Sequence, residues 1–200
     1  MKLSKIALTV IVAAAVATPA LRTIAADSAK DSGPYLTLDA GVNIMQDANT
    51  VDSSGKTGKA KFDTGWRVGL MGGYNINKYV GVELETGFID NGLKDSDRWI
   101  GTIPMLGNVV FRYENASGFV PYIGVGAGGA YSMVQGGGGD DQSDFVFAYQ
   151  AKAGVAYEIT PCMAVDIGYK FFGTADEKFG GTKVKDIYAH FIGLSFTFKF

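Results

Sequence analysis

The sequence predicts an all-β protein, an eight-stranded antiparallel transmembrane β-barrel with an up-and-down meander. Three observations predict this fold. Apolar side chains recur at every second position, which is the period of a strand and not of a helix. Segments with this pattern recur eight times between Leu36 and Phe200. The connections between them alternate between short turns and longer polar loops, a pattern expected of barrels that cross a membrane.

Each of the eight segments has one bulky apolar face and one face of small or polar residues. In the first of them, Leu36 and Leu38 alternate with Thr37 and Asp39. The segments are about 9 to 15 residues long, which is enough for a tilted strand to cross a bilayer. They cover residues 36–44, 66–76, 80–88, 103–113, 119–131, 145–159, 163–171 and 192–200.

The connections differ in length from one end of the barrel to the other. We expect short turns at residues 75–78, 114–118 and 160–162, and longer polar loops at residues 46–63, 91–101, 135–143 and 173–185. In barrels of this kind the short turns face the periplasm and the long loops face the outside. An even number of strands then places both ends of the barrel on the periplasmic side.

Residues 1–26 have the pattern of a secretory signal peptide. Lys2 and Lys5 give a positive start, an apolar run follows, and small residues suitable for cleavage come next. The apolar run of about 12 residues is too short to cross a bilayer as a helix. Cleavage near Ala20 and cleavage near Ala25 or Ala26 both fit the pattern. We therefore expect residues 1–26 to be removed after export and residues 27–200 to form the barrel domain.

Composition and motifs exclude several classes of function. The net charge of −2 provides no basic surface for nucleic acid. The single cysteine, Cys162, can form no internal disulfide, and no zinc spacing is present. The glycine run at residues 136–139, followed by two aspartates, lacks the helix and lysine of a phosphate loop and the spacing of a calcium loop. We expect no cofactor, no metal and no nucleic-acid partner.

The content of the two faces distinguishes a membrane barrel from a soluble one. A soluble barrel such as a lipocalin also alternates, but it needs large apolar residues inside and charges outside. Here the bulky face carries almost no charge, and a barrel with that face in water would aggregate. The small face suits the narrow interior of eight strands. We therefore expect lipid and lipopolysaccharide of the outer membrane to contact the bulky face.

Aromatic residues of the bulky face gather near the two ends of the strands, where membrane interfaces favour them. The group expected at the periplasmic rim is Tyr74, Tyr113, Phe119, Tyr157, Phe198 and Phe200. The group expected at the outer rim is Trp66, Phe88, Tyr131, Phe145, Phe147, Phe171 and Tyr188.

Three segments carry a resemblance to a known family. They are VPYIGVGAG at residues 120–128, DIGYK at residues 166–170 and the terminal FTFKF at residues 196–200. These segments resemble the small outer-membrane barrel superfamily that includes OmpA-type and OmpX-type domains, and the resemblance covers the whole of residues 27–200. It implies an eight-stranded barrel in a bacterial outer membrane. Because the sequence stops at the last strand, we expect no peptidoglycan-binding domain of the OmpA kind.

The end of the chain is similar to a signal found in that superfamily. A C-terminal Phe, with apolar residues at alternate positions before it, resembles the signal that the barrel-assembly machinery reads. The resemblance implies that this machinery is a partner during biogenesis. The residues that match the assembly signal are Ile192, Leu194, Phe196, Phe198 and Phe200.

Charged residues on the small face form a predicted lumen charge network. Buried charges must be paired or hydrated, so acids and bases enclosed in a narrow lumen are expected to pair. Two interpretations fit: a structural network that plugs the lumen, or a gate that lines a small or transient pore. A register error of one residue would exchange the faces. The members are Asp39, Arg67, Glu83, Glu85, Arg112, Lys152, Glu158, Asp166, Lys170 and Lys199.

The only histidine, His190, is predicted to lie on the lipid-facing side of the last strand near the outer interface. Outer-membrane lipid A deacylases have a Ser two residues after such a His, whereas Ile192 stands there in this chain. Ser195 falls on the opposite face, about 17 Å away at the rise of a strand. An omptin-like protease would need acids beside a His at the outer rim. We therefore expect the protein not to be an enzyme.

The function predicted from the sequence is that of a structural barrel that contributes to envelope integrity and displays surface loops. A narrow polar pore is one alternative. A barrel of the OmpW type, which passes small apolar solutes, would need an apolar lumen that this sequence is expected to lack. An adhesin or receptor is a further alternative, carried by the loops at residues 46–63 and 173–185. Nothing in these loops identifies a ligand.

Overall fold

The computed structural model describes residues 32–200 except 116, 137–141, 180–181 and 186. The predicted signal peptide at residues 1–26 lies outside the described residues, and so does the start of the predicted barrel domain. Among the residues that are described, no helix is both long enough and apolar enough to pass through a bilayer.

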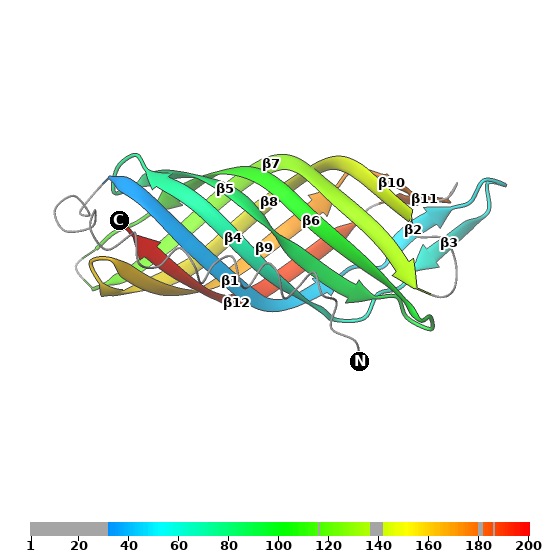
Figure 1. Ribbon diagram of the computed structural model, residues 1–200, viewed down its shortest axis with the longest axis horizontal. Coiled ribbons are helices and arrows are strands. Elements are labelled where there is room, and N and C mark those ends of the chain that lie inside the picture. The colour runs from blue at the N-terminus through cyan, green and yellow to red at the C-terminus, as the bar shows by residue number, and fades with distance from the viewer. Residues whose placement is uncertain (1–31, 116, 137–141, 180–181, 186) are drawn as a thin grey trace.

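The fold is a closed antiparallel barrel of eight strands, as the alternation predicted (Figure 1). Each strand pairs with its neighbour along the chain, and the first strand closes the ring against the last, from Tyr35↔Lys199 to Met45↔Ala189. The barrel strands are β1 (Gly33–Met45), β4 (Gly65–Asn75), β5 (Val80–Gly92), β6 (Arg98–Arg112), β7 (Phe119–Gly136), β8 (Gln142–Thr160), β9 (Met163–Thr174) and β12 (Tyr188–Lys199).

The short turns lie where the sequence predicted them, at one end of the barrel. Asn77 accepts hydrogen bonds from the backbone N–H groups of Tyr79 and Val80 and so stabilises the turn between β4 and β5. Gly118 has a φ of 77°, a conformation that glycine adopts without a steric penalty, just before β7 begins. Both ends of the described chain, at Gly33 and Phe200, lie at this same end.

The long loops at the other end are shorter than predicted, because the strands continue beyond the segments of apolar alternation. β5 and β6 are connected by residues 93–97 rather than 91–101, and β7 runs to Gly136 before β8 begins at Gln142. Pairs such as Arg98↔Gly136 and Val134↔Gln142 keep the backbone hydrogen bonded where the apolar alternation has ended. The strands end where backbone pairing ends. The predicted boundaries were set by the apolar alternation, which ends earlier.

The prediction that residues 46–63 and 173–185 are loops is also wrong, because here too strands extend into predicted loops. They contain four short strands, β2 (Ala48–Val51), β3 (Thr57–Ala60), β10 (Glu177–Phe179) and β11 (Thr182–Lys185). These form a second sheet in the order β10-β11-β2-β3, called here the outer sheet, which stands beyond the barrel strands (Figure 1). The central pairing joins Val184 to Thr50 across more than half of the chain.

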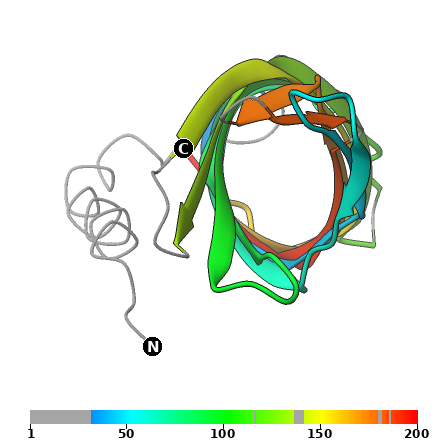
Figure 2. The same cartoon turned by 90° about the vertical axis from the view of Figure 1, so that its right-hand side faces the viewer.

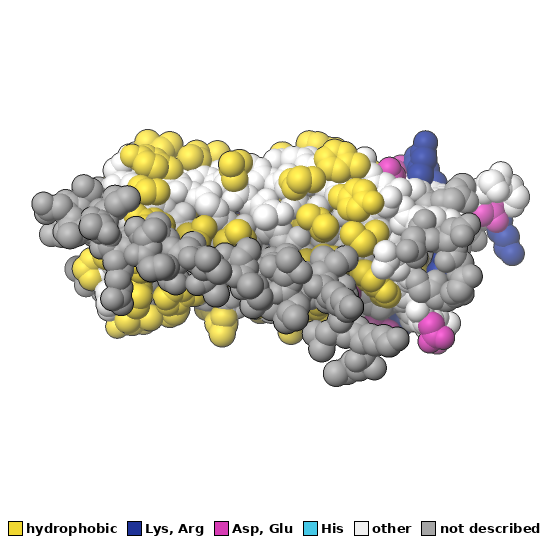
Figure 3. Space-filling model, in the orientation of Figure 1, with side chains coloured by type: hydrophobic (Ala, Val, Ile, Leu, Met, Phe, Trp, Pro, Cys, Tyr) yellow, Lys and Arg dark blue, Asp and Glu magenta, His cyan; other side chains and the backbone are white. Residues whose placement is uncertain are grey.

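The outward face of the barrel is apolar, as expected of a surface in contact with lipid. Leu84, Leu194 and Ile123 are among the large apolar side chains that are exposed. Figure 3 shows hydrophobic side chains gathered toward both ends of the barrel, and charged side chains at the end that carries the outer sheet. The aromatic residues named above lie on this outward face; the rings of Trp66 and Phe88, for example, contact each other at a tilt, with their centroids 5.7 Å apart.

The inward face is filled by side chains in successive layers from the periplasmic to the outer end. The charged residues occupy the first half. An apolar layer follows them, then a layer of uncharged polar residues that includes Asn43, Asn91 and Ser132. A last apolar cluster lies under the outer sheet and consists of Met45, Ala48, Phe62, Ile100, Val184 and Ile187.

Candidate functional site: the charged lumen

The structure places all ten residues of the predicted charge network on the inward face. Seven of them, from Asp39 to Lys170, are buried. Arg112, Glu158 and Lys199 lie nearer the periplasmic mouth and are partly exposed. The inward placement follows from the period of two: each residue alternates with exposed apolar neighbours on its own strand.

The centre of the network is a buried cluster from four strands. Lys170 on β9 donates to Asp39 Oδ2 on β1 and to Glu85 Oε1 on β5, in both cases over 2.6 Å. Arg67 on β4 donates to the same Glu85 oxygen and lies 3.6 Å from Asp39 through its Nε. Two acids and two bases thus neutralise one another where no water-exposed surface remains, which is the condition under which buried charges are tolerated.

A second cluster lies closer to the periplasm. Glu83 on β5 accepts hydrogen bonds from Lys152 on β8 and, over 2.7 Å, from the hydroxyl of Tyr35 on β1. Arg112 on β6 donates to the Tyr35 hydroxyl over 2.6 Å and lies 3.8 Å from Glu83. Lys152 is also 4.0 Å from Glu85, so the two clusters form one network.

Uncharged side chains complete this network. Asn108 and Gln150 donate to Glu85 Oε2 over 2.8 and 2.6 Å. Tyr122 donates to Asp166 over 2.8 Å, and Ser195 donates to the same oxygen over 3.1 Å. The sequence interpretation named only the charged members. The alternation of inward and outward positions would have identified the uncharged members as well, since Tyr122 and Asn108 alternate with outward residues on their strands.

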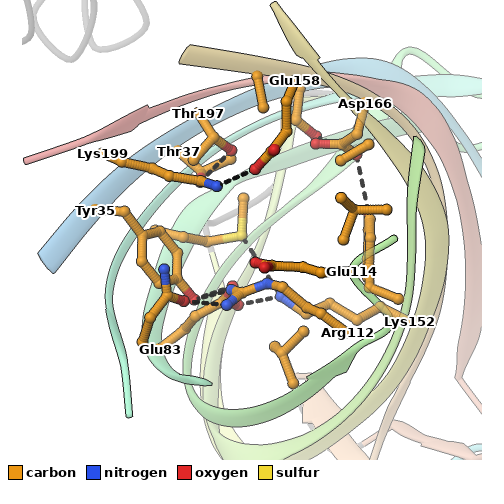
Figure 4. Close-up of a pocket in the computed structure, with 18 of the residues that line it drawn as sticks. Tyr35, Thr37, Glu83, Arg112, Glu114, Lys152, Glu158, Asp166, Thr197 and Lys199 are labelled. Carbon is orange, nitrogen blue, oxygen red and sulfur yellow. Dashed lines mark hydrogen bonds and ion pairs between the residues drawn. The ribbon is translucent and has the colours of Figure 1, made fainter. Parts of the chain in front are cut away.

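Among the described residues, no hydrogen bond or ion pair joins Glu158 or Lys199 to the buried network. They form an ion pair with each other at the periplasmic rim. Between this pair and the Glu83 cluster lies a cavity of about 70 Å³, and Figure 4 shows Tyr35, Arg112, Lys152 and Asp166 around it. A cavity of this size has room for only a few water molecules.

The outer half of the lumen contains an apolar layer, which the sequence analysis, concerned with the charged residues of the small face, did not predict. On each strand its members lie farther toward the outer end than the network residue of that strand. The layer contains Ile89, Leu106, Ala130, Ala148, Phe172 and Ala189. Near the outer ends of strands, apolar residues occupy both faces, as Phe171 and Phe172 do. The alternation of apolar and polar residues is lost there, so it could not predict this layer.

Phe191 links the apolar layer to the charges below it. Its ring lies 5.2 Å from the guanidinium carbon of Arg67 and 5.7 Å from the ammonium of Lys170. A cation over an aromatic face is attracted by the ring quadrupole, more strongly where water is absent. The two buried bases are therefore held by aromatic as well as acidic neighbours.

At the outer mouth, a carboxyl group from the outer sheet enters the barrel. Glu177 on β10 is 1% exposed and accepts hydrogen bonds from Ser132 on β7 over 2.9 Å and from Thr174 on β9 over 3.1 Å. Burial, opposed by these two hydroxyl donors, raises the pKa of Glu177 to about 7. The sequence analysis assigned residues 173–185 to a polar loop and so did not predict a buried Glu177, because that burial depends on the pairing of β10 with β11.

His190 lies on the outward side of β12, beside aromatic rings at the outer end. Its Nδ1 is 2.7 Å from the hydroxyl of Tyr169, and its Nε2 is 2.6 Å from the side-chain amide of Gln46. Ser195 faces inward and donates to Asp166. Both ring nitrogens of His190 therefore have partners that belong to the barrel wall, and Ser195 is on the other side of that wall.

The residues of the predicted assembly signal lie on the outward face of β12 and just after it. Ile192, Leu194 and Phe196 are exposed, and Phe198 and Phe200 are partly buried with their ring centroids 5.0 Å apart. These side chains form a continuous apolar strip that ends at the periplasmic rim.

Comparison with solved structures finds other outer-membrane barrels. Neisserial surface protein A shares 21% identity, with a TM-score of 0.61 over 86% of this chain and 99% of that chain. OprG of Pseudomonas aeruginosa shares 17%, with a TM-score of 0.56 over 86% and 99%. The outer-membrane protease OmpT of Escherichia coli shares 8%, with a TM-score of 0.50 over 86% and 98%. At such identities these likenesses concern the fold alone.

Comparison with curated protein sequences gives no match. A family model described as the outer membrane protein beta-barrel domain matches residues 7–200. This family match indicates the outer membrane as the location of the protein. Since the match covers nearly the whole chain, the protein belongs to the outer membrane protein beta-barrel domain family.

Proposed function

We propose that the protein is a non-enzymatic scaffold of the outer membrane, with a closed lumen and an outer sheet held above the membrane surface. In this role it contributes to envelope integrity and presents the outer sheet to the surroundings. The observation that carries the proposal is the buried charge network, which ties β1, β4, β5, β8 and β9 together across the lumen.

The filling of the lumen supports closure. A solute that crossed the barrel would have to separate Lys170 from its two carboxylates and then pass the apolar layer beyond them. Separating a buried, hydrogen-bonded ion pair leaves uncompensated charges in a medium of low polarity, which costs several kcal/mol. The cavity near the periplasmic rim ends at Lys170 in the middle of the network.

Swelling of lipid vesicles in a small sugar such as arabinose tests closure to solutes. The refolded protein, checked by the shift of its gel mobility on boiling, is expected to give no swelling above that of protein-free vesicles. A general porin serves as the positive control. Swelling that grows with the amount of folded protein would exclude a closed scaffold and favour the pore.

The residues available for catalysis support a role without it. The described residues contain no group of three His, Cys, Asp or Glu side chains that could hold a metal ion. His190 is bonded to Tyr169 and Gln46, neither of which is an acid that could orient it as a base. The paired lumen charges are shielded from substrates by the same burial that keeps the lumen closed.

Surface recognition is a second candidate function, and the outer sheet favours it. Four paired strands give the outer end a defined shape, and exposed positions such as Lys59 on β3 lie at its edge. Recognition is commonly located on segments held by a rigid scaffold. Bacteria that express the protein are expected to adhere to cultured epithelial cells less well after removal of residues 49–60. Unchanged adherence, with the shortened barrel still folded, would count against this role.

Export, assembly and lipid contact complete the proposal. A signal peptide at residues 1–26 would direct the chain to the periplasm, and the outward strip from Ile192 to Phe200 would be read by the barrel-assembly machinery. The apolar outer face would then contact lipid and lipopolysaccharide. Deletion of Phe200 is expected to lower the amount of folded protein in outer-membrane fractions, and an unchanged amount would contradict the assembly role.

A further inference from the structure

Glu177 is the one acidic side chain of β10, and it turns from the outer sheet into the mouth of the barrel. The Ser132 and Thr174 hydroxyls both donate to its Oε1. Its other oxygen, Oε2, is buried and has no hydrogen-bond partner among the described residues. A buried carboxylate with an unpaired oxygen is costly, and a neutral carboxyl in the same place costs less because it carries no charge. The geometry is therefore that of a group that carries a proton.

We propose that Glu177 is a pH-dependent latch: in its protonated form it holds β10 in the barrel mouth, and on ionisation it releases β10 and loosens the outer sheet. The element that moves, β10, is a strand of three residues. Apart from the pairing with β11, the backbone N–H of Lys178 donates to Asp144 Oδ2 on β8 over 2.7 Å. Figure 2 views the barrel from this outer end and draws β10 and β11, in orange, within the outline of the ring.

No base is placed to keep an ionised Glu177 in the mouth. Among the described residues, no Lys, Arg or His nitrogen lies within 4.0 Å of its carboxylate. In the antiparallel register of β10 and β11, Lys178, Lys183 and Lys185 fall on the opposite face of the sheet from Glu177.

The remaining charged groups near Glu177 either favour its neutral carboxyl or point away from it. Asp144 on β8 is a like charge that raises the pKa of Glu177 further. Asp176, the residue before the latch, is exposed and pairs with Lys183 over 2.7 Å. The contacts from β7 and β9 come from hydroxyl groups, Ser132 and Thr174, which carry no charge.

The direction of the pH effect follows from linkage. The docked carboxyl has a pKa of about 7, against 4.5 for a carboxyl in water. Below pH 4.5 both states are protonated and docking is fully favoured. Between these values the released state loses its proton while the docked state keeps it, so release becomes more favourable with each pH unit. Above pH 7 both are ionised and the effect levels off, after a total change in the release equilibrium of roughly 300-fold.

Hydrogen exchange of the refolded protein in lipid vesicles tests the latch. Exchange of β10 and β11 is followed by mass spectrometry from pH 4.5 to 8.5 and corrected for the intrinsic pH dependence of amide exchange. In the wild type, the corrected exchange is expected to rise between pH 5 and 7, by up to two orders of magnitude, and then to level off. A corrected exchange that stays flat over this range would overturn the proposal.

Two variants distinguish release controlled by Glu177 from a general loss of protection in the outer sheet as the pH rises. Glu177→Gln keeps a neutral hydrogen-bonding side chain in the mouth, so its β10 is expected to remain protected at every pH. Asp176→Asn removes a carboxylate from the same segment but not from the mouth, and its profile should follow that of the wild type. A Glu177→Gln variant with the wild-type pH dependence would exclude the latch.

A third variant keeps the test decisive if Glu177→Gln does not fold. Asp144→Asn removes the like charge that raises the pKa of Glu177 but leaves an oxygen to accept from the N–H of Lys178. The pH at which exchange levels off should then move to a lower value. An unchanged pH would show that Glu177 does not control release.

Discussion

Lys170 is the residue on which the lumen charge network depends most. Its ammonium contacts Asp39 and Glu85, each over 2.6 Å, and a ring from Phe191 lies over it. None of these partners is exposed to water that could replace the lysine. Removing one charge from such a cluster costs more than the net contribution of the cluster to stability, because the acids left behind stay buried.

Replacing Lys170 with Met keeps the length of the side chain but removes its charge. The free energy of unfolding in urea, measured on protein folded into vesicles, is expected to fall by about 3–5 kcal/mol. Lys199→Met removes a base from the partly exposed pair with Glu158 and should cost no more than about 1 kcal/mol. Equal losses in the two variants would contradict the account of a buried network at the centre and a separate pair at the rim.

At the scale of single strands, close approach between β6 and β7 depends on glycine. A Cβ added at Gly128 would lie 2.1 Å from the carbonyl oxygen of Met105, a contact with backbone that cannot swing away. Gly72 on β4 differs, since a Cβ there would meet no atom within 4 Å. The two positions therefore make a matched pair for testing the packing of the barrel wall.

Gly128→Ala is expected to lower the free energy of unfolding by about 1–3 kcal/mol, because the strands must separate to admit the methyl group. Gly72→Ala should be neutral or slightly stabilising, since it only restricts the unfolded chain. Urea titration followed by gel mobility measures both. Destabilisation by the Gly72 change and none by the Gly128 change would show that the strand spacing is not as described.

The outer sheet rests on the barrel through Phe62, which is buried against Ile100 and Val184. Phe62→Ala should remove about 3–5 kcal/mol from the local stability of the sheet. Hydrogen exchange is expected to accelerate in β2 and β11 while the barrel strands keep their protection. Thr57→Ala, at an exposed position of β3, is the control. Equal acceleration throughout the barrel would mean that sheet and barrel unfold as one unit.

The alternation of the sequence was enough to predict the barrel strands and the facing of their side chains. Arg67 and Lys152 alternate with exposed apolar residues, and a period of two leaves only one face for them. The outer sheet could not be predicted in this way. Val184 and Thr50 pair across most of the chain, and no local pattern in either segment records that pairing. The burial of Glu177 depends on the pairing of β10 with β11 in the same sheet, and it was missed for the same reason.

At the scale of the whole molecule, the barrel combines an apolar exterior with an interior whose charges balance. Closure of the ring satisfies the backbone in lipid, since every barrel strand has two neighbours. Inside, the five acids of the lumen charge network are matched in number by its five bases. The apolar layer and the outer sheet follow in the outer half. Each of these layers opposes the passage of ions.

Single-channel conductance of the refolded barrel in a planar bilayer tests the central claim, a lumen closed by paired charges. The wild type is expected to give no steps above background, from a sample whose gel mobility confirms folding. A double variant that removes two bases and their bulk, Arg67→Ala with Lys170→Ala, should admit water and give small steps. Reproducible steps in the wild type that change when Arg67 or Lys152 is replaced would contradict the closed scaffold and show that the network lines a pore.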